Sequence, residues 1–135
     1  MIKVDNSNDN LVEKYNDIKK YIQLRIKRDG LAVTAEKYKK IFKQKLDGII
    51  LEYESLSKNS YQNRIPYQKY ILLMNSRLSN IGPIYELVPE YNQEWLIEMM
   101  CDCHFIYLCY RMEIDSLIIE NYSSNYDDCM QILSR

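Results

Sequence analysis

Hydrophobic side chains recur at intervals of three or four residues between residues 11 and 28. They are Leu11, Tyr15, Ile18, Ile22 and Ile26. This spacing predicts the buried face of an amphipathic helix. Gly30 is expected to end the helix, because glycine readily adopts the left-handed conformation found after a helix. Residues 1–10 are mostly polar and are predicted to form a disordered leader.

Two more helices are predicted in the middle of the chain. Thr34 is the expected N-cap of the first, in which hydrophobic residues keep a helical spacing over residues 38–56. Residues 57–65 show no such period and are predicted to form a loop. Pro66 fits the first turn of the next helix, where the missing N–H of proline would have no helical partner in any case.

The stretch from about residue 92 to residue 120 is hydrophobic on almost every side. Its few polar residues include Glu94, Glu98 and Asp102, which are four apart and predict a narrow solvent-facing stripe. A helix this apolar is expected at the centre of a bundle. Two buried strands within residues 96–119 are the alternative, because β-branched and aromatic residues are frequent there. The length of the stretch favours the helix.

These patterns together predict an all-α fold. We expect a single-domain bundle of five or six helices over residues 11–135, built around a hydrophobic central helix at about residues 92–120. The last helix is expected near residues 123–133. A length of 135 residues suits one domain, and 47% hydrophobic with 27% charged residues argues against a disordered chain.

Composition narrows the class of protein further. Three glycines are too few for glycine-rich phosphate loops, which excludes dinucleotide-binding, P-loop and kinase folds. The longest apolar run, residues 105–110, is far shorter than the roughly 20 residues that cross a bilayer, so no membrane insertion is predicted. Four cysteines without a secretory signal predict reduced thiols in a cytoplasmic or nuclear protein.

One cluster of metal-ligating residue types lies inside the hydrophobic stretch. It consists of Cys101, Cys103, His104 and Cys109. On a helix, residues 101 and 103 point about 200° apart, and residue 109 lies roughly 12 Å further along the axis than residue 101. Because a zinc ion needs four ligands within bonding distance of one point, no metal site is predicted here.

His104 is the one histidine of the chain and therefore the one candidate for a histidine base. Cys101 lies on the same helical face, three residues earlier, which makes a Cys–His pair the enzymatic alternative. The carboxylates of Glu94, Glu98 and Asp102 lack the Glu-x-x-His spacing of bundle metalloproteins. The sequence thus predicts a non-enzymatic protein with no catalytic residue, no metal and no cofactor.

Charge is unevenly distributed along a chain whose net charge is −1. The first 50 residues carry twelve Lys and Arg against seven Asp and Glu, a net of +5, whereas the rest carry six against twelve, a net of −6. Lys37, Lys40 and Lys43 belong to the basic half. The helix that holds them and the helix before it form a helix-turn-helix-like segment at residues 11–46. A small nucleic-acid-binding regulator is therefore the alternative function, although six residues between the helices exceed the usual three or four.

Thirteen tyrosines favour a protein that binds another protein, because tyrosine provides a large amphipathic contact area at interfaces. We expect a regulatory factor of the inhibitor, immunity or accessory type. The bias toward Asn, Ile, Lys and Tyr suggests A+T-rich coding DNA, as in a virus, a phage or a low-GC microbe. Its partner is expected to be another protein, with a second copy of the chain (a homodimer) as one case. The predicted partner-binding residues are Tyr85, Tyr91, Trp95, Lys37, Lys40 and Lys43.

Overall fold

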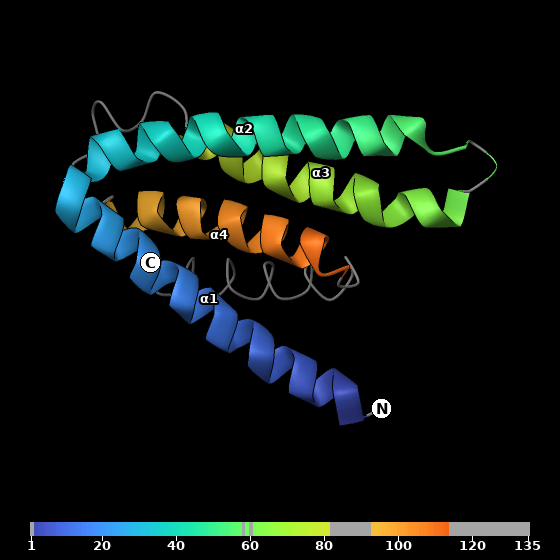
Figure 1. Cartoon of the computed structure of the whole chain (residues 1–135), viewed down its shortest axis with the longest axis horizontal. Coiled ribbons are helices and arrows are strands. Elements are labelled where there is room, and N and C mark those ends of the chain that lie inside the picture. Colours follow the sequence, from blue (N-terminus) through green and yellow to red (C-terminus); the bar gives the residue numbers. More distant parts are fainter. Residues whose placement is uncertain (1, 58, 60, 82–92, 114–135) are drawn as a thin grey trace, which may run out of the picture.

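The computed structural model describes residues 2–57, 59, 61–81 and 93–113 of the chain, and this part contains four α-helices and no strand (Figure 1). They are α1 (Ile2–Asp29), α2 (Leu31–Ser55), α3 (Tyr61–Ile81) and α4 (Gln93–Arg111). The all-α class is confirmed, whereas the predicted count of five or six helices is not matched. The short helix predicted at 123–133 lies outside the described residues.

Helix α4 packs against all three other helices, and more extensively against α1 and α3 than against α2. Helices α2 and α3 run side by side, and α1 crosses the bundle at an angle (Figure 1). The strand alternative is wrong for the described part of residues 96–119, which is helical up to Arg111. The helix expected to reach residue 120 ends there, because Glu113 adopts a positive φ of 57° that a helix cannot continue.

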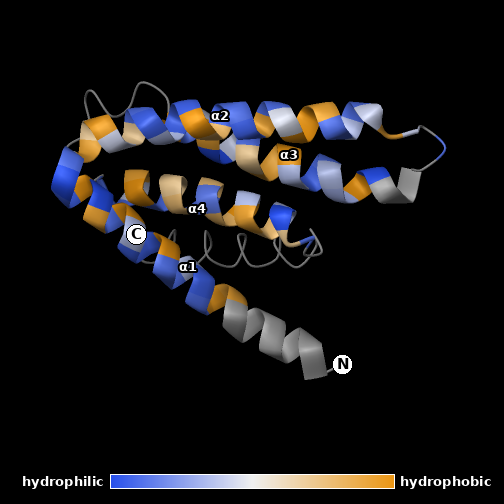
Figure 2. Ribbon diagram, in the orientation of Figure 1, coloured by the Kyte–Doolittle hydropathy of each residue, from blue (hydrophilic) through white to orange (hydrophobic). Residues whose placement is uncertain are grey.

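A single hydrophobic core joins the four helices. Hydrophobic residues recur among polar ones along each of them, and the hydrophobic side chains face the shared core (Figure 2). All of the following are at most 2% exposed: Leu11, Ile22, Ala35, Ile49, Met74, Ile81, Leu96, Met99, Met100, Cys101, Cys103, Phe105, Ile106 and Cys109. Helix α4 supplies eight of these fourteen residues, more than any other helix.

Helices α1 and α2 are joined by Gly30 alone. Gly30 has φ 90° and ψ 157°, a backbone region that is essentially restricted to glycine. Thr34 is not the N-cap that the sequence predicts, because α2 already begins at Leu31. The Thr34 hydroxyl instead donates a hydrogen bond to the carbonyl oxygen of Gly30 at 2.7 Å. A threonine can bond backward along a helix as well as cap one, and its local sequence does not distinguish the two.

Two other helix starts differ from the sequence prediction. Helix α3 begins at Tyr61, five residues before Pro66, so the predicted loop is shorter. A proline in the second turn removes one backbone hydrogen bond, and contacts with Tyr53 of α2 offset this loss. Gln68 donates to the Tyr53 hydroxyl at 2.7 Å, and the Arg64 guanidinium lies 4.2 Å from the centre of its ring. Helix α1 begins at Ile2, within the predicted leader, where neither glycine nor proline interrupts a helix.

The two described glycines are expected to respond in opposite ways to alanine. An added Cβ would meet no atom within 4 Å at either position. Gly30→Ala is expected to destabilise the protein by about 1–3 kcal/mol, because an L-residue is strained at φ 90°. Gly48→Ala, inside α2, should stabilise it by about 0.5–1 kcal/mol. Urea unfolding of both variants tests this, and changes of the same sign would contradict the backbone geometry.

Candidate binding groove

The carboxylates of α4 do not form the solvent-facing stripe that their spacing predicts. Glu94 is exposed, but Glu98 and Asp102 are only 6% and 4% exposed. Asp102 accepts two hydrogen bonds, one from Arg77 Nε and one from the Tyr15 hydroxyl, both at 2.9 Å. Arg77 on α3 compensates the buried charge of Asp102. The spacing of residues along α4 could not predict this partner, because Arg77 lies on another helix. The Tyr15–Asp102–Arg77 cluster therefore links α1, α4 and α3.

Cys101, Cys103 and Cys109 are buried free thiols. Burial raises the pKa of Cys101 and of Cys109 to about 12, and the pKa of Cys103 rises for the same reason. A protonated, inaccessible thiol is neither a nucleophile nor a zinc ligand. Among the described residues, no three His, Cys, Asp or Glu side chains gather as a metal site.

His104 has Tyr38, and not Cys101, as its hydrogen-bonding neighbour. Nδ1 of His104 lies 3.4 Å from the Tyr38 hydroxyl oxygen. The imidazole ring is surrounded by Tyr21, Tyr38 and Phe42, with ring centres 5.4–6.2 Å away. Burial, reinforced by the charge of Lys45, lowers the pKa of His104 below its usual value of 6.5. The ring is therefore neutral at pH 7 and forms part of an aromatic wall.

The predicted partner-binding residues are separated in the structure. Lys37, Lys40 and Lys43 are exposed on α2, and the Lys37 ammonium lies 3.9 Å from the Asp29 carboxylate. Trp95 is 43% exposed in the first turn of α4. Tyr85 and Tyr91 lie outside the described residues. No contact brings Trp95 to the lysines in the part of the chain that is described.

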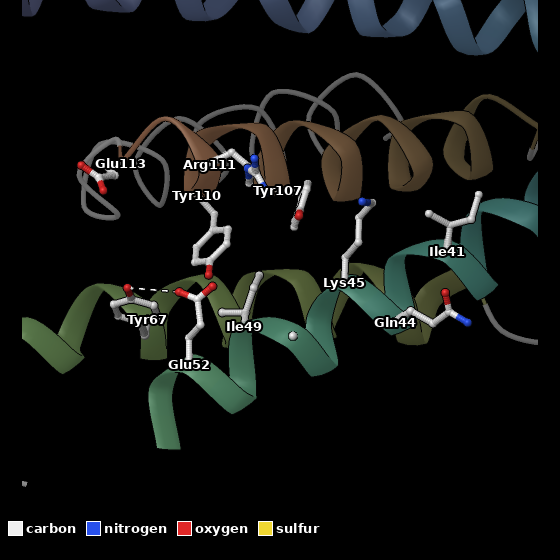
Figure 3. Close-up of a pocket in the computed structure, with 11 residues that line it drawn as sticks. Ile41, Gln44, Lys45, Ile49, Glu52, Tyr67, Tyr107, Tyr110, Arg111 and Glu113 are labelled. Atoms are coloured by element: carbon white, nitrogen blue, oxygen red, sulfur yellow. Dashed lines mark hydrogen bonds between the residues drawn. The ribbon is translucent and has the colours of Figure 1, made fainter. Parts of the chain in front are cut away.

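An open groove of about 570 Å³ lies between α2 and α4, with α3 at one end (Figure 3). Lys45 reaches from α2 toward α4, while Tyr107 and Tyr110 point from α4 toward α2. Gly48, which has no side chain, helps to leave the space between the helices open. The groove is lined by Ile41, Gln44, Lys45, Gly48, Ile49, Glu52, Tyr67, Tyr107, Tyr110, Arg111 and Glu113.

The groove has two electrically different ends. At one end the Lys45 ammonium lies 4.4 Å from the centre of the Tyr107 ring, a cation–π contact. Arg111 is exposed on α4 and lies beside Tyr110, between Tyr107 and Glu113 (Figure 3). At the other end Glu52 accepts a hydrogen bond from the Tyr67 hydroxyl at 3.4 Å. Burial, together with the Glu52 carboxylate, raises the pKa of both Tyr67 and Tyr110. The phenols therefore stay protonated and can donate hydrogen bonds.

A second hollow, the aromatic pocket, extends the groove toward α1 and has a volume of about 340 Å³. It shares Ile41, Lys45, Tyr107 and Arg111 with the groove. Its remaining lining residues are Tyr21, Arg25, Tyr38, Phe42, His104 and Leu108. The groove and the aromatic pocket together form one continuous depression along α2 and α4.

Sequence reasoning did not single out the residues of the groove. Tyr107 and Tyr110 belong to a hydrophobic run and were assigned to the core, yet both are only half-buried. One signal was present: Tyr107, Tyr110 and Arg111 are three and four residues apart, which places three polar-tipped side chains on one face of α4. Lys37 and Lys40 precede Ile41 and Gln44 by one turn, so the predicted basic face of α2 borders the groove.

Comparison with protein-family models, with curated proteins and with solved structures finds no match for this chain. None of the described helices is both long and apolar enough to cross a membrane. Inferences about function rest on the geometry of the groove and of the aromatic pocket.

Proposed function

We propose that this protein acts by binding another protein, as a regulatory factor of the inhibitor, immunity or accessory type, and that the groove between α2 and α4 is its binding surface. The observation that carries the proposal is an open groove of about 570 Å³ lined by three tyrosines and by charges of both signs. Tyrosine is enriched in interfaces because it offers a large apolar area together with a hydroxyl donor.

The charges of the groove indicate which partner segment fits. Lys45 at one end and Arg111 near the middle favour an acidic side chain, and Glu52 and Glu113 at the other end favour a basic one (Figure 3). An amphipathic helix laid along the groove would present such charges one or two turns apart. A helical segment of the partner that carries an acidic side chain near one end and a basic side chain near the other therefore fits the groove better than a segment with charges of one sign.

A photo-crosslinking experiment in the native host tests the proposal. A benzoylphenylalanine residue at position 44, inside the groove, is expected to yield one defined adduct with a host protein. The same residue at position 72, which is exposed on α3 away from the groove, should yield none. An adduct of twice the chain mass would identify a second copy as the partner.

Charge reversal in the groove tests whether its charges hold the partner, and an equal charge reversal outside the groove is the matched control. K45E combined with R111E should abolish the adduct from position 44, because an acidic side chain of the partner would then be repelled. K20E combined with K27E changes the net charge equally on exposed lysines of α1 that do not line the groove. Equal adducts from positions 44 and 72, or an adduct that survives K45E/R111E, would contradict the proposal.

The alternative function, binding of nucleic acid, draws support from Lys37, Lys40 and Lys43, which are all exposed on α2. The connection within the helix-turn-helix-like segment 11–46 is Gly30 alone, shorter than the usual turn of three or four residues. Nucleic-acid binding predicts retention on a DNA column that falls steeply with salt and is lost when the three lysines are replaced by glutamine. Elution at low salt would exclude it.

A further inference from the structure

All the charged residues that line the aromatic pocket are positive. They are Arg25, Lys45 and Arg111, and no carboxylate of the described residues lines this pocket. None of the three forms an ion pair with another described residue. Asp29, one turn after Arg25, is engaged by Arg28 at 3.0 Å and by Lys37 at 3.9 Å. The pocket therefore holds an excess of positive charge.

The walls of the aromatic pocket are rigidly placed. Tyr38 and Phe42 are 7% and 4% exposed, because their inner faces belong to the core. The Phe42 ring centre lies 5.4 Å from that of Tyr38, 5.4 Å from that of His104 and 6.2 Å from that of Tyr107. An apolar slot that is formed before the ligand arrives binds with a small loss of conformational entropy.

Two of the cations are also held in place before binding. The Arg25 guanidinium lies 5.5 Å from the centre of the Tyr21 ring, and the Lys45 ammonium lies 4.4 Å from that of Tyr107. These cation–π contacts fix the heads of two flexible side chains at the edge of the slot. Positive charge next to a preformed aromatic wall is the complement of a molecule that is both aromatic and anionic.

We propose that the aromatic pocket binds a free organic anion with one or two aromatic rings. Its carboxylate or phosphate lies between Arg25, Lys45 and Arg111, and its ring lies against Phe42, His104 and Tyr107. The volume of about 340 Å³ is near the low end of the roughly 300–1,000 Å³ typical of ligand pockets. This small volume limits the ligand to one or two rings. The site overlaps the groove at Lys45, Tyr107 and Arg111, whereas Arg25, Tyr38 and Phe42 line the aromatic pocket alone.

The lone histidine provides a direct assay, since His104 gives the one histidine Hε1 signal in the NMR spectrum. We expect 1-naphthyl phosphate and 1-naphthoate to shift this signal in a saturable manner. Neutral 1-naphthol and cationic 1-naphthylmethylamine should leave it in place at the same concentrations, and inorganic phosphate should bind much more weakly. A histidine signal that does not move with either anion, or that moves equally with naphthol, would overturn the proposal.

Variants test whether the charges act locally. R25Q and K45Q should each weaken binding of 1-naphthyl phosphate roughly tenfold, because each removes one charge-assisted interaction. K43Q removes an exposed lysine that does not line the pocket and should leave the affinity unchanged. An equal loss with K43Q would mean that net charge alone attracts the anion and would refute the site. Unchanged amide spectra of the free variants would show that each is folded.

Discussion

Replacing Arg77 by methionine is expected to destabilise the protein by about 3–5 kcal/mol, the typical result of breaking a buried ion pair. The side chains of Arg77 and Asp102 are 10% and 5% exposed, and Nε lies 2.9 Å from the carboxylate oxygen. Without the guanidinium, Asp102 would lose this ion pair while its carboxylate stays buried in the core. Urea unfolding at pH 7 measures the loss.

The chain contains a matched control for this prediction. Arg28 and Asp29 form an ion pair of nearly the same length, 3.0 Å, but the Arg28 side chain is 61% exposed. R28M should therefore change the unfolding free energy very little, since water replaces the lost partner. A loss as large as that of R77M would show that burial is not the cause.

A second comparison, between R77M and a triple variant, separates the effect of an uncompensated charge from the effect of a changed side-chain shape. The triple variant R77M/D102L/Y15F replaces all three polar partners of the Tyr15–Asp102–Arg77 cluster by apolar groups. It should recover most of the stability that R77M alone loses, because the Asp102 carboxylate that loses its cationic partner in R77M is then absent. If the triple variant were as unstable as R77M, the cluster would contribute through its shape and not through its charges.

Phe105→Ala is the other change with a large expected effect, a loss of about 3–5 kcal/mol. Phe105 is 1% exposed and meets the Tyr15 ring edge-on, with the ring centres 5.4 Å apart. Its removal would leave a cavity and would free the ring that presents the Tyr15 hydroxyl to Asp102. Thermal and urea unfolding should both show the loss.

Tyr107 gives the contrast within the same helix. It is half-buried and lines the groove, so Tyr107→Ala should cost much less stability than Phe105→Ala. It should nevertheless remove the ring that contacts Lys45. If the two alanine variants were equally unstable, Tyr107 would belong to the core and not to a binding surface.

The parts of the fold that depend on local spacing were predictable from the sequence. Leu11, Tyr15, Ile18 and Ile22 were placed on one face of a helix, and all four are buried. The same holds for Tyr38, Phe42, Leu46 and Ile49 in α2. A period of three to four residues needs only neighbours along the chain, so it can be read without knowing what packs against it.

Features that depend on distant partners were not predictable. The burial of Asp102 requires Arg77, 25 residues earlier, and Tyr15, 87 residues earlier. The aromatic pocket requires α1, α2 and α4 to meet at one end of the bundle. The start of α3 was also missed, because the helix extends before Pro66 and residues on both sides of this proline contact Tyr53 of α2. In each case the deciding interaction joins residues far apart in the sequence.

The three buried thiols of α4 can report how often this helix separates from the rest of the bundle. An alkylating reagent can reach Cys101, Cys103 or Cys109 only when α4 separates from its neighbours. Where reclosing is faster than alkylation, the labelling rate relative to that of a free thiol gives the equilibrium constant for that separation. Because α4 packs against all three other helices, the labelling rate of these three thiols, measured separately from that of Cys129 by peptide mass, reports the separation of α4 from the core.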